Sequence, residues 1–114
     1  MTFKPADVVT VNFPGVTGIK RRPAVILSSI TYHANRPDVI VGLITTQTAA
    51  LGVTDYTLQD WAAAGLRVAS IFRSFIVTLP SSANLVLIGH LSERDWKNVR
   101  ACVKLSLTKL DDPS

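Results

Sequence analysis

The sequence has one cysteine, Cys102, and two histidines, His33 and His90, which lie far apart in the chain. A lone cysteine excludes an internal disulfide, and two histidines without companion cysteines do not supply the ligands of a structural zinc site. We therefore expect neither a metal nor another cofactor. Cys102 falls on the apolar face of the last expected helix, where a small buried group is a commoner role than a nucleophile.

Long apolar runs are missing as well. The longest, Val39–Ile44, covers six residues, whereas a membrane-spanning helix needs roughly 20. The amino terminus reaches a polar strand start at Asp7 without the apolar segment of a secretory signal. These absences predict a cytoplasmic protein.

The composition is that of a folded chain, with 47% hydrophobic and 18% charged residues. With 114 residues there is room for one core, so we expect a single domain over residues 1–114. The net charge is +4, and three cations, Lys20, Arg21 and Arg22, are consecutive. Such a cluster is either a solvated loop or a loop that binds anions.

Short segments rich in apolar and β-branched residues predict most of the fold. They are Asp7–Phe13, Ala24–Leu27, Asp38–Thr45, Val53–Leu58, Arg67–Phe72, Phe75–Leu79 and Leu85–Ile88. Pro14-Gly15 is expected to end the first strand and to open a loop that carries the basic cluster to Arg22. Residues 28–37 are polar and turn-like, with room for one helical turn, and residues 46–51 are expected to be loop.

Two helices are expected in the second half. Asp60 is placed to cap a short helical segment, Trp61–Ala64, that Gly65 ends. Ser92, followed by an acid three residues on, is the expected N-cap of a helix from Glu93 to Leu110, whose apolar residues recur every three or four positions. Its cations, Arg94, Lys97, Arg100 and Lys104, would form a solvated face. The predicted class is mostly β (α+β): a small antiparallel barrel or strongly twisted sheet with a helix packed on it.

The order of these pieces resembles the MazF/PemK family. The matching segments are Asp7–Val9, the run from Lys20 through Arg22-Pro23 to Ser29, the strand from Asp38 that ends in Ile44-Thr45-Thr46-Gln47, and Gly89 to Arg100. The resemblance covers nearly the whole chain. It implies a CcdB/MazF-type, SH3-like fold and the toxin of a type II toxin–antitoxin pair, a homodimeric, sequence-selective endoribonuclease of single-stranded RNA. It also implies a cognate antitoxin whose acidic, disordered tail covers the RNA groove.

The resemblance assigns catalysis to Arg22 and Thr45. Metal-free RNA cleavage uses the substrate's 2′-hydroxyl to attack phosphorus, leaving a 2′,3′-cyclic phosphate and a 5′-hydroxyl. The guanidinium of Arg22 suits the stabilisation of charge on the phosphorane, and the hydroxyl of Thr45 would position the phosphate. The RNA-binding residues are expected to be Lys20, Arg21, Thr46, Gln47 and Arg67. Phe13 and Trp61 are further candidates for contacts with unpaired bases.

The expected proton carriers are absent. Many relatives have an acid in the first loop or an Arg-x-Asp pair on a later strand, but residues 15–19 include no acid, and Ala69 stands where the second carboxylate would be. The general base and acid therefore stay unassigned. His90 could move protons, although helix capping or a dimer contact is the plainer role, and His33 is expected in a surface loop. Two alternatives stay open: a catalytically inactive RNA-binding barrel and a gyrase-binding, CcdB-like toxin on the same scaffold.

Overall fold

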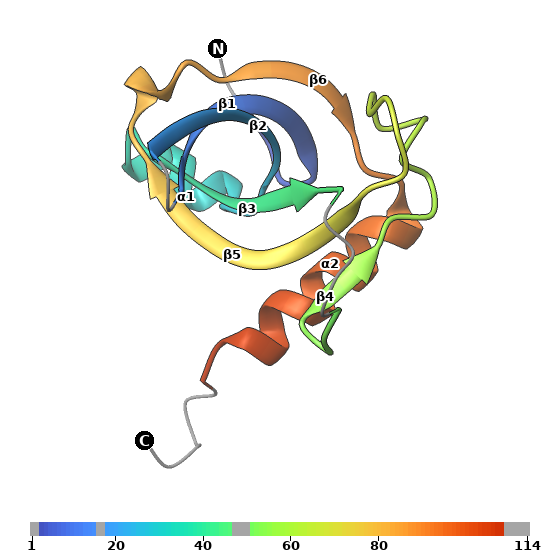
Figure 1. Ribbon diagram of the computed structural model, residues 1–114. Helices are drawn as coiled ribbons and strands as arrows, with labels where there is room; N and C mark the ends of the chain where they lie inside the picture. Colours follow the sequence, from blue (N-terminus) through green and yellow to red (C-terminus); the bar gives the residue numbers. More distant parts are fainter. Residues whose placement is uncertain (1–2, 16–17, 47–50, 109–114) are drawn as a thin grey trace.

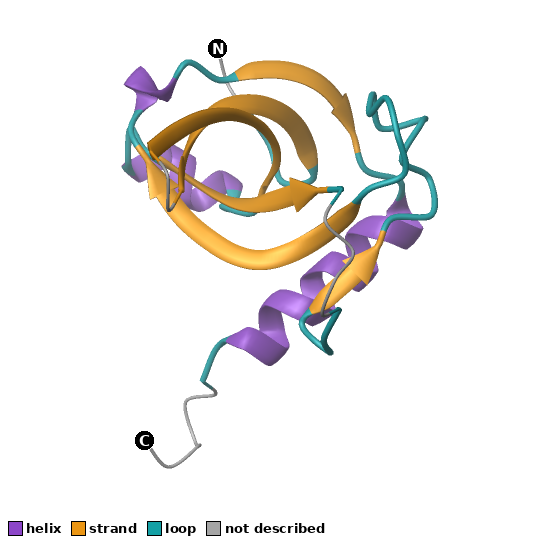
Figure 2. Ribbon diagram, viewed as in Figure 1, coloured by secondary structure: helices purple, strands orange, loops and turns teal. Residues whose placement is uncertain are grey.

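The computed structural model describes residues 3–15, 18–46 and 51–108, and in them one sheet of six antiparallel strands carries two α-helices (Figures 1 and 2). The elements are β1 (Asp7–Gly15), β2 (Gly18–Ile26), α1 (Ile30–Asn35), β3 (Val39–Thr45), β4 (Asp55–Thr57), β5 (Ile71–Leu79), the 3-10 turn η1 (Ser81–Ala83), β6 (Val86–His90) and α2 (Glu93–Ser106). Neighbouring strands follow the order β4-β5-β3-β2-β1-β6. The predicted class, a twisted antiparallel sheet with a carboxy-terminal helix, is confirmed.

The sheet curls strongly (Figure 1), and apolar side chains pack against both of its faces. Along β1, Val9, Val11 and Phe13 enter one cluster with residues of β2, β3 and the β5–η1 segment. Val8 points to the other face, where the second cluster lies against α2 through Val99 and Cys102. This alternation follows from the two-residue period of a strand. Cys102 is buried as expected, and burial raises the pKa of its thiol.

The basic cluster lies in a strand, so the predicted loop is wrong. β1 and β2 form a continuous hairpin ladder from Val8 opposite Val25 to Gly15 opposite Gly18. Backbone hydrogen bonds of a ladder do not depend on side-chain charge, and alternation sends adjacent cations to opposite faces. The Arg21 side chain therefore projects from one face of the sheet, and the side chains of Lys20 and Arg22 project from the other.

Three other predictions differ from the structure. The two strands expected over residues 67–79 are one, β5, which starts at Ile71. Residues 61–65 form turns instead of a helix, and Gly65, which was expected to end that helix, ends the turns with a φ of +87°. His33 lies in α1, where its ring contacts the Ser28 hydroxyl and the Phe3 carbonyl, so the surface-loop prediction is wrong.

Helix α2 begins as predicted and ends earlier. The Ser92 hydroxyl accepts a hydrogen bond from the Asp95 backbone N–H at 3.2 Å, as an N-cap does. The helix stops at Ser106, because Leu107 is extended and the Ser106 hydroxyl donates to the Cys102 carbonyl, satisfying a last-turn acceptor. The expected end, Leu110, lies outside the described residues.

The first turn of α2 anchors the chain segment before it. Asp95 is fully buried, and its carboxylate accepts hydrogen bonds from the Tyr56 hydroxyl at 2.7 Å and from the backbone N–H groups of Gln59 at 3.0 Å and Asp60 at 2.8 Å. Burial, together with this carboxylate, raises the pKa of Tyr56 to about 12. The segment that leads into the loop of residues 58–70 is thereby fixed to the helix.

Candidate functional site

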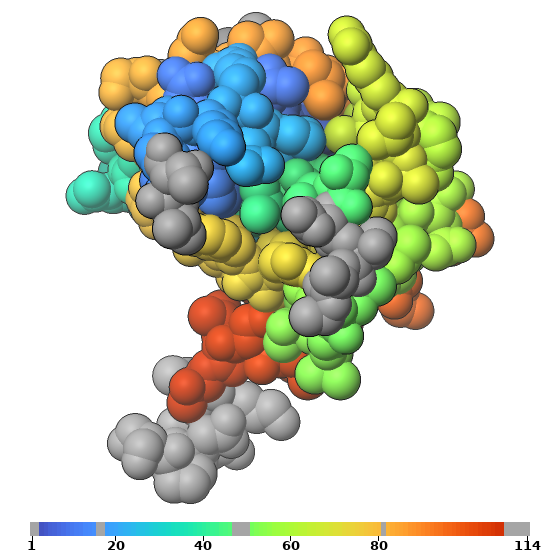
Figure 3. All heavy atoms as spheres, viewed as in Figure 1, coloured from blue at the N-terminus to red at the C-terminus, as the bar shows by residue number. Residues whose placement is uncertain are grey.

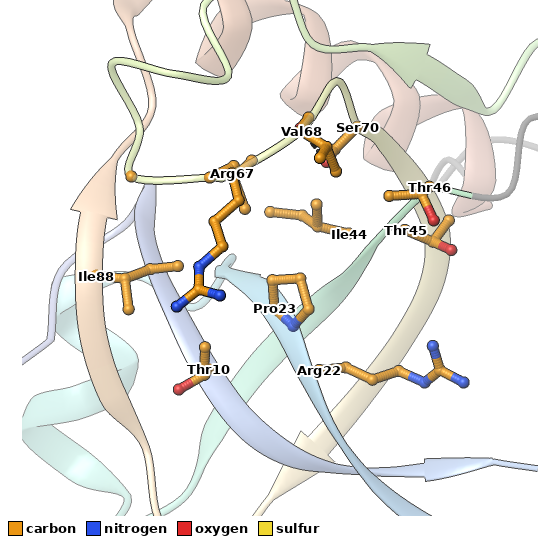
Figure 4. A pocket seen from close by; sticks show the side chains of 12 residues that line it. Thr10, Arg22, Pro23, Ile44, Thr45, Thr46, Arg67, Val68, Ser70 and Ile88 are labelled. Carbon is orange, nitrogen blue, oxygen red and sulfur yellow. Dashed lines mark hydrogen bonds between the residues drawn. The ribbon is translucent and has the colours of Figure 1, made fainter.

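A cavity of about 500 Å³ opens where β2 and β3 separate, and the loop of residues 65–70 covers one side of it (Figure 4). Figure 3 shows β2, β3 and the segment before β5 meeting on one face of the molecule. The lining residues are Thr10, Arg22, Pro23, Ile44, Thr45, Thr46, Gly65, Leu66, Arg67, Val68, Ser70 and Ile88. The two predicted catalytic residues, Arg22 and Thr45, therefore share one cavity with two predicted RNA-binding residues, Thr46 and Arg67.

The register of the sheet explains why Arg22 and Thr45 belong together. β2 pairs with β3 from Ile26 opposite Val41 to Ala24 opposite Leu43. Continuing this register by two residues sets Arg22 opposite Thr45, and both side chains leave the same face of the sheet. Both residues are half-buried. The structure thus brings the two predicted catalytic residues to one edge of the cavity.

Two cations enter the cavity without a protein partner. Within the described residues, the side chains of Arg22 and Arg67 make no hydrogen bond or ion pair. Figure 4 shows their guanidinium groups directed apart, that of Arg67 toward Thr10 and Ile88 and that of Arg22 to the far side of Pro23. Because unpaired guanidinium groups beside a cavity are not needed to satisfy the fold, they are free to bind an anion.

A close backbone contact holds the loop that carries Arg67. A Cβ atom on Gly65 would lie 2.1 Å from the Ile88 carbonyl oxygen, and one on Gly89 would lie 2.0 Å from the Ala64 carbonyl oxygen. Only glycine at both positions lets the two backbones touch. Gly89 belongs to the motif before the last helix, so that motif places the cavity wall through its backbone.

Arg21 does not line the cavity, and its donors are occupied. The guanidinium donates to the Thr10 hydroxyl at 3.0 Å, to the Asn12 side-chain carbonyl at 3.3 Å and to the Asn84 backbone carbonyl at 2.6 Å. The two adjacent arginines therefore occupy different environments: Arg21 ties β1 to the segment before β6, and Arg22 faces the cavity.

The remaining predicted contacts are dispersed. Lys20 is exposed on β2 and does not line the cavity, and Gln47 lies outside the described residues. Phe13 is only 1% exposed, so it offers no stacking surface to a base. Trp61 packs against the core cluster under α2. Neither aromatic residue belongs to the cavity lining.

Among the described residues that line the cavity there is no aspartate, glutamate or histidine. Ala69 is exposed at the position of the missing carboxylate. His90 lies at the end of β6, where its Nδ1 is 2.9 Å from the Asp7 carboxylate, and Ser92 is the residue that caps α2. The helix-capping expectation for His90 is therefore wrong.

The sequence did not indicate the apolar walls of the cavity, which come from Pro23, Ile44, Leu66, Val68 and Ile88. One signal was available: the polar Thr10 lies between Val9 and Val11, and it is the β1 residue that lines the cavity. No group of three or more His, Cys, Asp or Glu in the described part of the chain could hold a metal ion. No described helix has the length and apolarity to cross a membrane.

Comparisons with known proteins agree with this architecture. MazF from Deinococcus radiodurans superposes with a TM-score of 0.73 at 20% identity, over 94% of this chain and 99% of that chain. An endoribonuclease in complex with its cognate antitoxin from a mycobacterial species gives 0.73 at 16% identity, over 95% and 99%. Mycobacterium tuberculosis toxin MazF-mt6 gives 0.66 at 22% identity, over 85% and 94%. These likenesses show the fold.

No curated protein matches this chain in sequence. A protein family does, over residues 4–107, and its description is PemK-like, MazF-like toxin of type II toxin-antitoxin system. This match spans β1 to α2 and includes the residues around the cavity. The chain therefore belongs to the PemK-like, MazF-like toxins of type II toxin–antitoxin systems.

Proposed function

We propose that the protein is a metal-independent endoribonuclease that cuts single-stranded RNA by attack of the 2′-hydroxyl on the adjacent phosphorus. Arg22 stabilises the negative charge of the phosphorane, and the Thr45 hydroxyl positions the phosphate. Thr46 and Arg67 hold neighbouring parts of the strand. Lys20 and Arg21 would contact the RNA outside the cavity lining, and Gln47 lies outside the described residues. The products are a 2′,3′-cyclic phosphate and a 5′-hydroxyl.

One observation carries the proposal: an unpaired guanidinium, Arg22, shares a cavity and a sheet face with the Thr45 side chain. A phosphorane carries more charge on its oxygens than a phosphodiester does. A fixed guanidinium fork therefore binds the transition state more tightly than the ground state, which is the condition for catalysis. An arginine also keeps its charge at every working pH.

The lack of a carboxylate or imidazole in the described cavity lining favours one competing function, an RNA-binding barrel that does not cut. In the nuclease that we propose, water takes the 2′-proton and supplies the proton of the leaving oxygen, because the described cavity lining offers no group for either step. General acid–base groups typically contribute about 100- to 10,000-fold each. We therefore expect slower chemistry than in relatives that possess the carboxylate. The family match argues against the gyrase-binding alternative.

The test is incubation of purified protein with mixed-sequence single-stranded RNA in excess EDTA, with sequencing of both fragment ends. Recurring cuts at a short sequence, with 5′-hydroxyl ends, support the nuclease. Salt-sensitive binding without cuts supports the inactive RNA-binding barrel, since phosphate contacts by cations weaken steeply as salt rises. Neither cuts nor binding would overturn both functions.

We also propose two protein partners. An antitoxin with an acidic segment would neutralise the toxin by placing carboxylates on the unpaired guanidinium groups. A mycobacterial endoribonuclease with the same fold is known in complex with its cognate antitoxin, which supports an antitoxin partner. A second copy of the chain would complete a homodimer. Sedimentation at micromolar concentration tests the dimer, and competition between an acidic peptide and RNA tests the antitoxin mode.

A further inference from the structure

We propose that the cavity wall formed by Thr10, Pro23, Arg67 and Ile88 is a subsite for one unpaired base that presents two adjacent hydrogen-bond acceptors, which means guanine or cytosine. The inference rests on the proposed RNA substrate and adds the base that the site selects. It separates the task of Arg67 from that of Arg22, which faces the scissile phosphate.

The wall is mostly apolar, as a surface that receives the face of a base should be. Pro23, Ile44, Leu66, Val68 and Ile88 supply hydrocarbon surface from β2, β3, β6 and the loop. A phosphate would gain nothing from such surroundings, whereas the flat rings of a base bury apolar area there. Specific RNA recognition reads unpaired bases in this way, by contact with their faces and hydrogen bonds to their edges.

The polar groups on this wall are donors. Arg67 offers a planar fork of N–H groups and, within the described residues, has no partner. The Thr10 hydroxyl already accepts from Arg21 at 3.0 Å, so the hydrogen of its own O–H remains to be donated. Figure 4 shows the Arg67 guanidinium directed toward Thr10. Arg21 thus occupies one lone pair of the Thr10 hydroxyl and leaves its O–H hydrogen available to a ligand.

The guanidinium fork of Arg67 presents two adjacent N–H donors, and such a pair selects a base with two adjacent acceptors. Guanine presents O6 and N7, and cytosine presents O2 and N3. Adenine and uracil place an N–H donor beside or between their acceptors, and that donor would face the guanidinium unpaired. Ser70 also lines the cavity, but its hydroxyl donates its hydrogen to the Val68 carbonyl at 2.9 Å and therefore offers no further donor to the base.

The experiment measures binding with substrates that cannot be cut. Short oligouridine strands with 2′-fluoro sugars lack the attacking hydroxyl, and one central base is replaced by guanine, cytosine or adenine. We expect the strand with guanine or the strand with cytosine to bind about tenfold more tightly than the strands with adenine or uracil, which is the discrimination of one bidentate contact. The 7-deazaguanine and 3-deazacytosine strands, each lacking one acceptor, show which base is read, because only the deaza form of the preferred base loses affinity.

Variants assign the preference to Arg67. Arg67→Lys keeps the charge and loses the fork, so the preference should fall below about twofold while the salt dependence stays. Arg22→Lys is the matched control and should retain the preference. Thr10→Val should weaken it partly, and thermal unfolding verifies that each variant folds.

Several results would overturn the subsite: equal binding of all bases, a preference for adenine or uracil, no binding at all, or a preference that survives Arg67→Lys. The nuclease is tested separately with the ribose form of the same strands. Cleavage of the ribose strands without a binding preference for guanine or cytosine would contradict only the base subsite. A binding preference without cleavage would contradict only the nuclease.

Discussion

Two charged regions of the molecule differ in how their charges are satisfied. At the start of α2, the Asp95 carboxylate has three donors, and Asp60 accepts hydrogen bonds from Ser92 at 2.6 Å and from Arg94 at 2.7 Å. The guanidinium of Arg94 lowers the pKa of Asp60. At the cavity, Arg22 and Arg67 have no partner among the described residues. The paired charges stabilise the fold, whereas the unpaired guanidinium groups are available to bind an anion.

This contrast predicts that substitutions in the two regions separate activity from stability. The largest effect is expected for Arg22→Ala, which should lower the RNA cleavage rate about 100- to 1000-fold, or about 3 to 4 kcal/mol, by removing a preorganised donor. The free energy of unfolding should change by less than about 0.5 kcal/mol, because the Arg22 side chain makes no hydrogen bond or ion pair with the described residues. Single-turnover cleavage and urea unfolding measure both. A near wild-type rate would remove Arg22 from the mechanism.

The reverse pattern is expected for Asp95→Ala. The change leaves a hydroxyl and two backbone N–H groups without their acceptor, and it should cost about 3 kcal/mol of stability. Urea unfolding at neutral pH measures the loss. Cleavage by the fraction that remains folded should be close to that of the wild type, and a selective loss of cleavage with unchanged stability would contradict this division.

Gly65→Ala lies between the two regions, because its loop carries Arg67. The added methyl would clash with the Ile88 carbonyl, and alanine would have to adopt the positive φ of Gly65. We therefore expect the free energy of unfolding to fall by about 2 kcal/mol. Gly52→Ala is the control, since a Cβ there meets only the Asp55 carboxylate at 3.9 Å. If thermal unfolding shows equal effects at both glycines, the backbone contact does not hold the loop.

The smallest effect is expected for Tyr56→Phe, about 1 kcal/mol for one lost hydrogen bond. The folded pKa of Tyr56, about 12, lies above its ordinary 10.0, so the fold favours the neutral phenol. Its contribution is complete below pH 10 and is lost as the pH rises toward 12. The unfolding midpoint should therefore fall less between pH 8 and pH 11 in the variant than in the wild type. An equal fall would show that Tyr56 does not titrate in this range.

The sequence predicts the strands and the last helix well, because apolar alternation and the Ser92 cap are local signals. It misplaces the basic cluster, because ladder pairing with β1 overrides the repulsion of adjacent cations. The meeting of Arg22 and Thr45 came from family resemblance and not from periodicity, since register depends on pairing between distant segments. The different environments of Arg21 and Arg22 could not be predicted either, because the Asn84 carbonyl that engages Arg21 lies 63 positions away.

The central claim is that this cavity stabilises a phosphorane formed by the RNA's own 2′-hydroxyl. The most direct measurement uses an RNA that the protein cuts, with a single 2′-deoxy nucleotide placed on the 5′ side of the cut. If the 2′-hydroxyl is the attacking group, cutting at this position stops while binding persists, and the unmodified RNA yields a 2′,3′-cyclic phosphate. Cleavage of the deoxy strand at the same bond would contradict it.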